Sequence, residues 1–344
     1  MASSHRLTLR LRLEDLVALA FFLINLLVRI LFRTSARQNL SPADVLIIIP
    51  AVTLLLGKEL VHYFIAARSA HAATAEGPMD FVRPYWEIIR DWFPFLAILL
   101  MYYSLWGDAT LMLVTTDRDQ ALIAIDQRLF GCQASVVLQH FVTPGLTAWM
   151  DVAYFYHIIN IPLVACFVYM RRDRARFREM MSGVMVISFL GLVGYLLVPA
   201  IGPMYTLRAQ YTVPLRQSMG VFNREMDFMD FARIRRDVFP SLHVGISFVV
   251  WLYAYRNSKK LFWIISPLIL SLWVSTVYLR YHYVIDVIAG LILAPISYLL
   301  ANWLFRHFGD VPVSFAIPES WAERLPWLAK PRPAALPEKV NEGQ

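Results

Sequence analysis

Long apolar runs dominate the hydrophobic pattern of this chain, and polar residues gather in the shorter stretches between them. A helix needs about 20 mostly apolar residues to cross the hydrocarbon core of a bilayer. Runs that approach this length lie at residues 13–32, 44–67, 93–115, 147–170, 180–200, 242–255, 261–279 and 283–305. The pattern therefore predicts an all-α, polytopic membrane protein with about eight transmembrane helices.

Two segments depart from this pattern. Residues 117–142 are too polar to span, and they predict a pair of amphipathic helices on the membrane surface. The segment from residue 306 contains six prolines and predicts a loosely structured tail. We therefore divide the chain into two N-terminal helices with a linker at 1–92, a six-helix core at 93–305 and a Pro-rich cytoplasmic tail at 306–344.

Composition supports a membrane location. Hydrophobic residues make up 58% of the 344 and charged residues only 17%, whereas soluble proteins carry about 25% charged residues. The formal net charge of +7 does not require a nucleic-acid partner, because the inner loops of membrane proteins are rich in Lys and Arg. We expect no nucleic acid, and we assign no role to Cys132 and Cys166, which lack any metal-binding spacing.

Two basic loops orient the chain in the membrane. Residues 171–178, "RRDRARFR", contain five arginines, and residues 256–260 read "RNSKK". Two crossings separate these loops, so they lie on the same side, and the positive-inside rule makes that side cytoplasmic. The first run ends in Arg29 and Arg33 and not in a small-residue cleavage site, so we expect it to remain as a helix.

Three polar clusters converge on the opposite, outer face by this counting. They are "GYLLVPAIGPMY" at 194–205, "RRDVFPSLHVGISF" at 235–248 and "LRYHYVIDVIAG" at 279–290. Asp286 falls one turn inside a predicted span, and buried ionisable residues in membranes are rare and usually functional. The agreement of the three clusters on one face therefore predicts a site there.

The residues next to each of the two histidines suggest what that histidine does. Ser241 suits the N-cap of a helix that carries His243 in its first turn, where free N–H groups favour an anion such as phosphate. His282 and Asp286 are four residues apart, so a helix would place the carboxylate beside the imidazole. A carboxylate in this position sets the tautomer, leaves the other ring nitrogen free to attack and stabilises the charged ring.

Other polar residues favour plainer interpretations. His157 and Asn160 lie inside the run at 147–170 and are typical of hydrogen bonds between helices. A transporter or channel would continue its polar residues through the membrane, whereas these spans are nearly free of them. A non-catalytic scaffold would not need the pairing of His282 with Asp286. Both alternatives remain open beside an enzyme.

The motifs also resemble a known family. "PSLH" at 240–243 is similar to the second motif of the type 2 phosphatidic acid phosphatase superfamily, and "YHYVIDVIAG" at 281–290 resembles its third. "DQRLFG" at 126–131 and "VPAIGP" at 198–203 resemble the subgroup of inositol phosphorylceramide synthases, which are inositolphosphotransferases. The resemblance covers about residues 93–305.

This resemblance implies phosphoryl transfer through a phosphohistidine without a metal or another cofactor. It makes His282 the nucleophile, Asp286 the residue that orients it and His243 the acid that protonates the leaving oxygen. Ser241 and the backbone N–H groups near it would hold the phosphoryl oxygens.

The chain departs from the family at the phosphate-binding cations. The first motif, with its Lys and Arg, is absent, and Arg208 is the nearest cation to its expected place. The family's Arg before the third motif falls on Thr276, but Arg280 follows four residues later, on the same face if the helix is regular. We therefore expect Arg280 and Arg208 to bind the phosphate.

The predicted function is transfer of a phosphorylated headgroup between lipids by a membrane enzyme whose substrate is a lipid phosphate or phospholipid. Hydrolysis of a lipid-linked phosphate or diphosphate is the alternative, and a transporter or scaffold is a further one. The expected location is a bacterial inner membrane, with the active site facing the periplasm or the outside.

Overall fold

The computed structural model describes residues 6–32, 42–71, 78–105, 109–215 and 234–316. These residues form two compact units. The first comprises the described residues within 1–12, 52–93 and 310–344, and the second those within 13–51 and 94–309. We describe each unit by itself.

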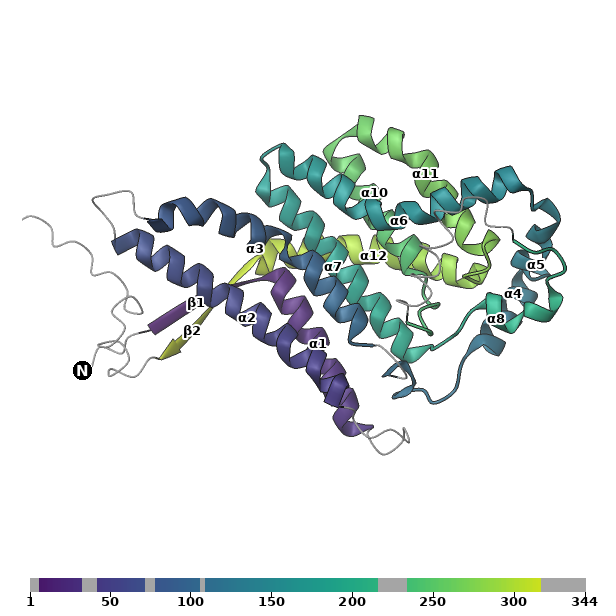
Figure 1. Ribbon diagram of the computed structural model, residues 1–344, viewed down its shortest axis with the longest axis horizontal. Coiled ribbons are helices and arrows are strands. Elements are labelled where there is room, and N and C mark those ends of the chain that lie inside the picture. The colour runs from purple at the N-terminus through teal and green to yellow at the C-terminus, as the bar shows by residue number, and fades with distance from the viewer. Residues whose placement is uncertain (1–5, 33–41, 72–77, 106–108, 216–233, 317–344) are drawn as a thin grey trace, which may run out of the picture. The chain divides into compact units, whose positions relative to one another are not determined.

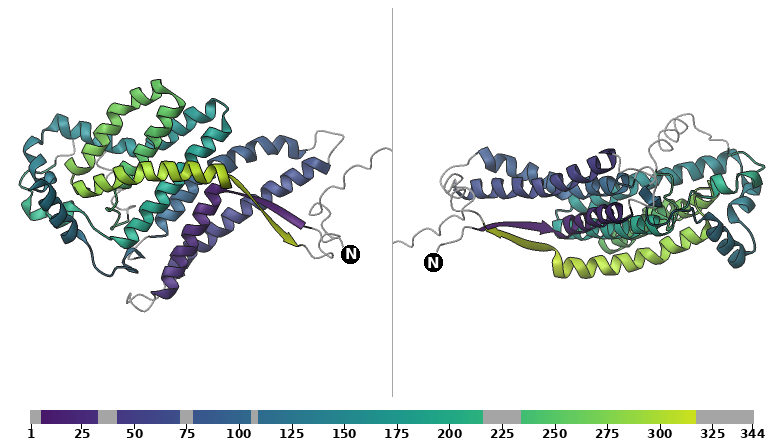
Figure 2. Two further views of the ribbon diagram at one scale, coloured as in Figure 1. Left: turned by 180° about the vertical axis from the view of Figure 1, so that it is seen from behind. Right: turned by 90° about the horizontal axis from the view of Figure 1, so that it is seen from below.

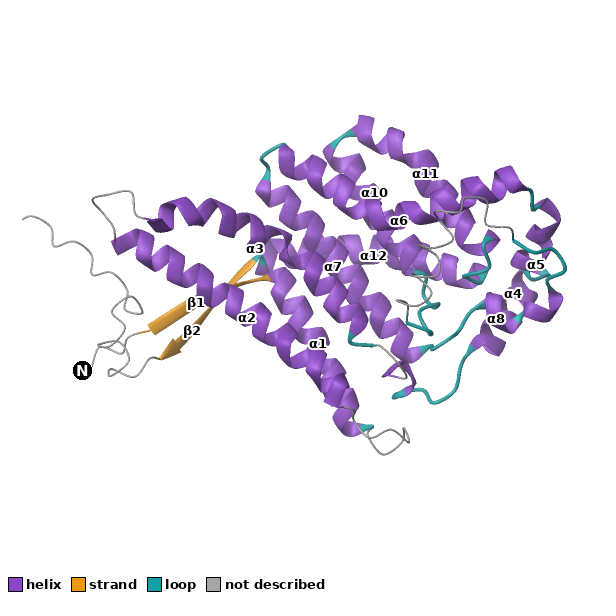
Figure 3. Ribbon diagram, in the orientation of Figure 1, coloured by secondary structure: helices purple, strands orange, loops and turns teal. Residues whose placement is uncertain are grey.

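Helices make up almost all of the second unit (Figures 1 and 3). Its long helices are α1 (Leu13–Leu31), α6 (Pro144–Met170), α7 (Arg174–Leu197), α10 (Leu242–Asn257), α11 (Lys259–Tyr278) and α12 (Val284–Phe308). It also holds the start of α2 (Pro42–His71) and the end of α3 (Pro78–Tyr103). Its short elements are η1 (Ala109–Leu111), α4 (Asp119–Phe130), α5 (Ala134–Leu138), η2 (Gln139–Phe141), α8 (Pro203–Thr206) and η3 (Arg208–Gln210). Helix α10 packs against α7, α11 and α12, and α6 packs against α11.

Side-chain caps explain where several of these helices begin. Thr143 caps α6 by accepting from the Leu146 N–H at 3.3 Å, and Pro144 follows it at the first helical position. Asp173 caps α7 at 3.1 Å, and Ser258 caps α11 at 3.2 Å. Both caps lie in the basic loops, so the turns between these crossings are short and well defined.

The prediction of a polytopic, all-α membrane protein is confirmed. Among the described residues, five helices are long and apolar enough to cross a membrane, or six if the bent pair of α4 with α5 and η2 counts as one crossing. They are Ile48–Ala66, Pro144–Met170, Arg174–Leu197, Lys259–Tyr278 and Val284–Phe308. Each of the eight predicted runs overlaps one long helix. The remaining helices α1, α3 and α10 carry charges or are short, and α10 has only 16 residues.

Helix α3 begins and ends at other residues than predicted. Helix α3 covers Pro78–Tyr103, whereas the apolar run was placed at 93–115. The end of that run contains Gly107, a poor helix former. The predicted helix pair at 117–142 is present as α4 and as α5 with η2, which meet at an angle of 71° beyond Gly131, and its place on the membrane surface stays a prediction. Gly131 has a φ of 71°, in the left-handed region that glycine adopts readily at a helix C-terminus.

The first unit contains a strand pair that the sequence reading missed. Strand β1 (Arg6–Arg12) pairs antiparallel with β2 (Asp310–Ala316), with Arg12 opposite Asp310. The two strands lie side by side in both views of Figure 2. Strand β2 lies inside the tail predicted to be loose, so that prediction is wrong for residues 310–316. Alternating apolar residues in both segments were the available signal.

Buried ion pairs join strand β1 to α3 and helix α2 to α3 in this unit. Arg12 lies 2.9 Å from Asp91, and Glu59 lies 2.6 Å from both Arg90 and Lys58. All five side chains are buried. Because an unpaired buried charge is strongly destabilising, these residues form one mutually dependent set.

Candidate active site

The three polar clusters come together where α7 and α11 end and where α10 and α12 begin. The Ser241 N–H donates to the Asp286 carbonyl at 3.1 Å, and the Met204 N–H donates to the Arg280 carbonyl at 2.9 Å. Gly194 packs so closely on Pro240 that an added Cβ would lie 2.3 Å from the proline ring. The predicted convergence of the clusters is therefore present in the structure.

The basic loops lie at the other ends of these helices. Arg171 donates to the Asn257 carbonyl at 3.0 Å, and Arg256 forms an ion pair with Glu179 at 2.7 Å. These contacts join the start of α7 to the end of α10. The polar clusters and the basic loops are thus separated by the length of the helices.

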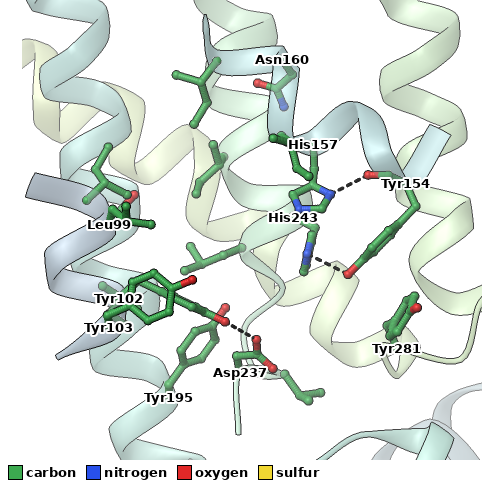
Figure 4. Close-up of a pocket in the computed structure, with 18 of the residues that line it drawn as sticks. Leu99, Tyr102, Tyr103, Tyr154, His157, Asn160, Tyr195, Asp237, His243 and Tyr281 are labelled. Carbon is green, nitrogen blue, oxygen red and sulfur yellow. Dashed lines mark hydrogen bonds between the residues drawn. The ribbon is translucent and has the colours of Figure 1, made fainter. Parts of the chain in front are cut away.

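A line of four side chains forms the centre of the site. His282 Nδ1 lies 3.5 Å from Asp286 Oδ2, and His282 Nε2 lies 3.1 Å from His243 Nδ1. The other ring nitrogen of His243, Nε2, lies 3.0 Å from the Tyr154 hydroxyl (Figure 4). His282 is 2% exposed and Asp286 is fully buried. Sequence reasoning found the two histidines and the aspartate but missed Tyr154, which lies about ninety residues earlier on α6.

The start of α12 holds Asp286 in place. Asp286 Oδ2 accepts from the Tyr283 N–H at 2.8 Å, which closes a capping box. Asp126, in "DQRLFG", accepts from the Val284 and Ile285 N–H groups at 2.8 and 2.9 Å. This motif therefore supports, from α4, the start of the helix that carries Asp286, a role that the sequence alone did not reveal.

The "VPAIGP" segment is tied to the same helix start. Asp119 accepts from the Ile201 and Gly202 N–H groups at 3.0 and 2.8 Å, and from the Tyr283 hydroxyl at 2.8 Å. Gly202 has a φ of 95°, and an added Cβ would lie 2.9 Å from the Tyr281 carbonyl oxygen. Only glycine fits there without strain.

The arginines predicted to bind phosphate lie elsewhere. Arg280 is buried, its guanidinium stacks 4.0 Å from the centre of the Tyr211 ring, and it donates to the Val213 carbonyl at 2.5 Å. Burial lowers the pKa of Arg280 from its ordinary value. Arg208 is exposed in η3. Neither lines the cavity beside the histidines, so their role in phosphate binding stays a prediction.

The geometric reason given for Arg280 is wrong. Helix α11 ends at Tyr278, and Arg280 has a φ of 68°, outside the helical region. Arg280 therefore does not share a regular helical face with Thr276. The Thr276 carbonyl instead accepts from the Tyr281 and His282 N–H groups at 3.0 Å each.

Ser241 is the N-cap of α10, as predicted. Its hydroxyl faces the Val244 N–H at 3.5 Å, and it is 1% exposed. In this position it shapes the helix start that carries His243. Its predicted contact with a phosphoryl oxygen is not tested.

A cavity of about 520 Å³ opens beside the two histidines. Its lining is mostly apolar and comes from α3, α6, α7, α10 and the segments just before α10 and α12. The polar side chains include Tyr102, which donates to Asp237 at 2.7 Å (Figure 4). None of the described residues that line the cavity is Lys or Arg.

His157 and Asn160 also face this cavity, and the predicted hydrogen bonds to other helices are wrong among the described residues. His157 Nδ1 bonds to the Tyr154 carbonyl of its own helix at 2.6 Å. Asn160 is 1% exposed, and neither polar atom of its side chain has a hydrogen-bond partner in the described chain.

Comparisons with known proteins agree with this geometry. A family model described as the PAP2 superfamily matches residues 120–300, which include both histidines and Asp286. A protein named phosphoinositol dihydroceramide synthase, from Bacteroides thetaiotaomicron, is 25% identical over 211 residues, covering 55% of this chain and 67% of its own. No solved structure matches.

Proposed function

Because this chain belongs to the PAP2 superfamily, which supports transfer or hydrolysis of a lipid phosphate, we propose that it is a phosphotransferase. It moves a phosphorylated headgroup from one lipid to the alcohol of another through a phosphohistidine on His282. The observation that carries this proposal is the line of polar side chains in which Asp286 lies beside His282, and hydrogen bonds join His282 to His243 and His243 to Tyr154.

The charge of the Asp286 carboxylate decides which atoms donate and which accept along this line of side chains. An ionised Asp286 only accepts, so His282 Nδ1 carries the ring proton and His282 Nε2 has a free lone pair. His243 Nδ1 must then donate to that lone pair, and His243 Nε2 accepts from the Tyr154 hydroxyl. Every group has one consistent role, and the lone pair of His282 Nε2 is the nucleophile.

In the first step the phosphoryl group of the donor lipid takes the place of the hydrogen bond between His243 and His282. His282 Nε2 attacks phosphorus and the bond from phosphorus to the donor lipid's alcohol oxygen breaks. His243 acts in this step as the imidazolium: its Nε2 has taken up a proton from solvent and donates to the Tyr154 oxygen, and its Nδ1 gives a proton to the leaving oxygen. Asp286 stabilises the positive charge on the phosphorylated ring.

In the second step neutral His243 takes the proton of the acceptor alcohol. The alcohol oxygen attacks phosphorus, the P–N bond breaks and His282 is regenerated. Protons and charges balance over the two steps, so no metal is needed in this scheme. A chelator should then leave activity unchanged, and loss that a divalent ion restores would contradict the metal-free mechanism.

The nature of the substrates follows from the cavity and the relative. The mostly apolar lining suits lipid chains. The relative's name favours a phosphoinositol headgroup and a ceramide-type acceptor. By the positive-inside rule the site opens on the outer face of the bacterial inner membrane, opposite the basic loops.

Purified protein incubated with a panel of phospholipids, with and without ceramide or diacylglycerol, tests this function. We expect a new phospholipid that forms only when an acceptor lipid is present. Headgroup release without a new lipid would favour the lipid phosphatase alternative. Acid-labile label from a phosphate-labelled donor should appear on wild type and be absent from His282→Ala, and a labelled alanine variant would refute the assigned nucleophile.

A further inference from the structure

Asn160 is a polar residue of the cavity that has no role in the proposed phosphoryl transfer. Its amide is 1% exposed, lines the cavity from α6 and has no hydrogen-bond partner among the described residues. Buried amides are nearly always hydrogen-bonded, and an exception calls for an explanation. A bound ligand that pairs with the amide would supply one.

The neighbouring polar groups of the cavity already have partners. Tyr102 pairs with Asp237, Tyr154 with His243, and the Ser188 hydroxyl with the Val184 carbonyl at 2.7 Å. In Figure 4 Asn160 lies at the end of the cavity away from Asp237. The protein therefore provides a separate polar point at this end.

The position of Asn160 relates it to the reacting atoms. Tyr154, His157 and Asn160 follow at intervals of three residues on α6, so they lie on one side of the helix. The His157 ring lies 4.6 Å from the His243 ring. Asn160 is about 9 Å along the axis from Tyr154, at about 1.5 Å per residue. Because Asn160 and both histidines line one cavity, a single lipid can reach Asn160 and the reacting histidine together.

The amide demands a particular partner. It offers N–H donors and a carbonyl acceptor, so a partner that satisfies both must itself accept and donate. The amide linkage of an N-acylated amino alcohol does this, because it carries a C=O and an N–H. The ester linkages of a diacylglycerol only accept, and they would leave the Asn160 carbonyl unpaired.

We propose that Asn160 is a specificity-determining residue that binds the amide linkage of the acceptor lipid and selects it over a diacylglycerol. This inference rests on the proposed transfer reaction. A site built to pair with a donor rejects an analogue that lacks it, because its own polar atom is left buried and unpaired. We expect wild type to prefer ceramide over a chain-matched diacylglycerol by about 10–100-fold in kcat/KM.

The test compares both acceptors on wild type, Asn160→Leu and Ser188→Ala, with acid-labile label on the enzyme as an acceptor-independent readout. Asn160→Leu should lower kcat/KM for ceramide to near that for diacylglycerol and leave labelling unchanged. Ser188→Ala should keep the wild-type preference, because that hydroxyl is already paired with its own helix. Equal losses on both acceptors, or an unchanged preference in Asn160→Leu, would overturn the assignment.

A change in the substrate tests the same contact without any variant. N-methylated ceramide lacks the amide N–H but keeps the chains and the hydroxyl groups. We expect the kcat/KM of wild type for N-methylated ceramide to be lower than that for ceramide by about tenfold or more. Equal use of the two would overturn the role of Asn160. Absence of both label and transfer in wild type would overturn the proposed reaction, and this inference with it.

Discussion

Asp286→Asn separates the two tasks of the buried carboxylate. Asp286 Oδ2 accepts from the Tyr283 N–H at 2.8 Å and lies 3.5 Å from His282 Nδ1, whereas Oδ1 has no hydrogen-bond partner among the described residues. An asparagine can place its carbonyl oxygen where Oδ2 lies, so both contacts remain. The change then removes the negative charge and little else.

The magnitude follows from that distance. A unit charge 3.5 Å from the imidazolium contributes about 4–5 kcal/mol at an effective dielectric constant of about 20. The positive charge on the imidazolium forms only when His282 is phosphorylated. Loss of the Asp286 charge should therefore slow phosphorylation by about 10³-fold. Asp286→Ala should be equally slow and should also lose the helix cap, at about 1 kcal/mol of stability.

Single-turnover labelling by a phosphate-labelled donor measures the rate, and thermal unfolding in detergent measures the stability. We expect an unchanged unfolding midpoint for Asp286→Asn and a lower one for Asp286→Ala. A labelling rate within tenfold of wild type in Asp286→Asn would refute the electrostatic argument. An equally low midpoint for both variants would refute the assignment of Oδ2 to the cap.

Four further outcomes follow from the structure. His243→Ala should lose less activity on an aryl phosphate ester than on an alkyl ester, because a general acid matters most for a basic leaving oxygen; equal losses would make His243 a structural residue or a phosphate ligand. Tyr154→Phe should slow phosphorylation and leave the unfolding midpoint unchanged, since His243 Nε2 loses the hydroxyl that holds its ring at 3.0 Å; an unchanged labelling rate would refute this role of Tyr154. Glu59→Gln should destabilise the fold by about 3–5 kcal/mol, because it leaves buried cations without their partner, and an unchanged unfolding midpoint would contradict this. After replacement of the native cysteines, Ser218→Cys, which lies outside the described residues, should react with an impermeant thiol reagent in intact cells and Ser258→Cys only after lysis; the reverse pattern would invert the proposed orientation.

The helices could be predicted because a membrane span needs only a run of apolar residues, which is a local property of the sequence. The same holds for the N-cap at Ser241, where the residue type and the following helix are adjacent. The pairing of β1 with β2 was harder, since about 300 residues separate the strands. Alternation marks a strand but does not name its partner. The division of the chain at residue 93 stays a prediction.

The site divides in the same way. His282 and Asp286 are one helical turn apart, so their spacing carried the prediction. Asp126 and Tyr154 contact the site from more than eighty residues away, and a single sequence holds no record of such contacts. The prediction placed Arg280 on the same helix as Thr276, because no proline or glycine in the sequence marks the end of α11 at Tyr278.

The two helix starts at the site are not equivalent for a phosphate. At α12 the N–H groups of Tyr283, Val284 and Ile285 are already taken by the carboxylates of Asp286 and Asp126. That end therefore presents negative charge, which suits the imidazolium of His282 but opposes a phosphate. At α10 the cap is the neutral hydroxyl of Ser241, so the positive end of this helix is not cancelled by a carboxylate from its own cap. Since no Lys or Arg lines the described cavity, we expect phosphate binding to depend on α10 and His243, and we expect much of the substrate's affinity to come from its apolar chains. Water-soluble phosphate esters that lack those chains should therefore react poorly even where the catalytic groups are intact.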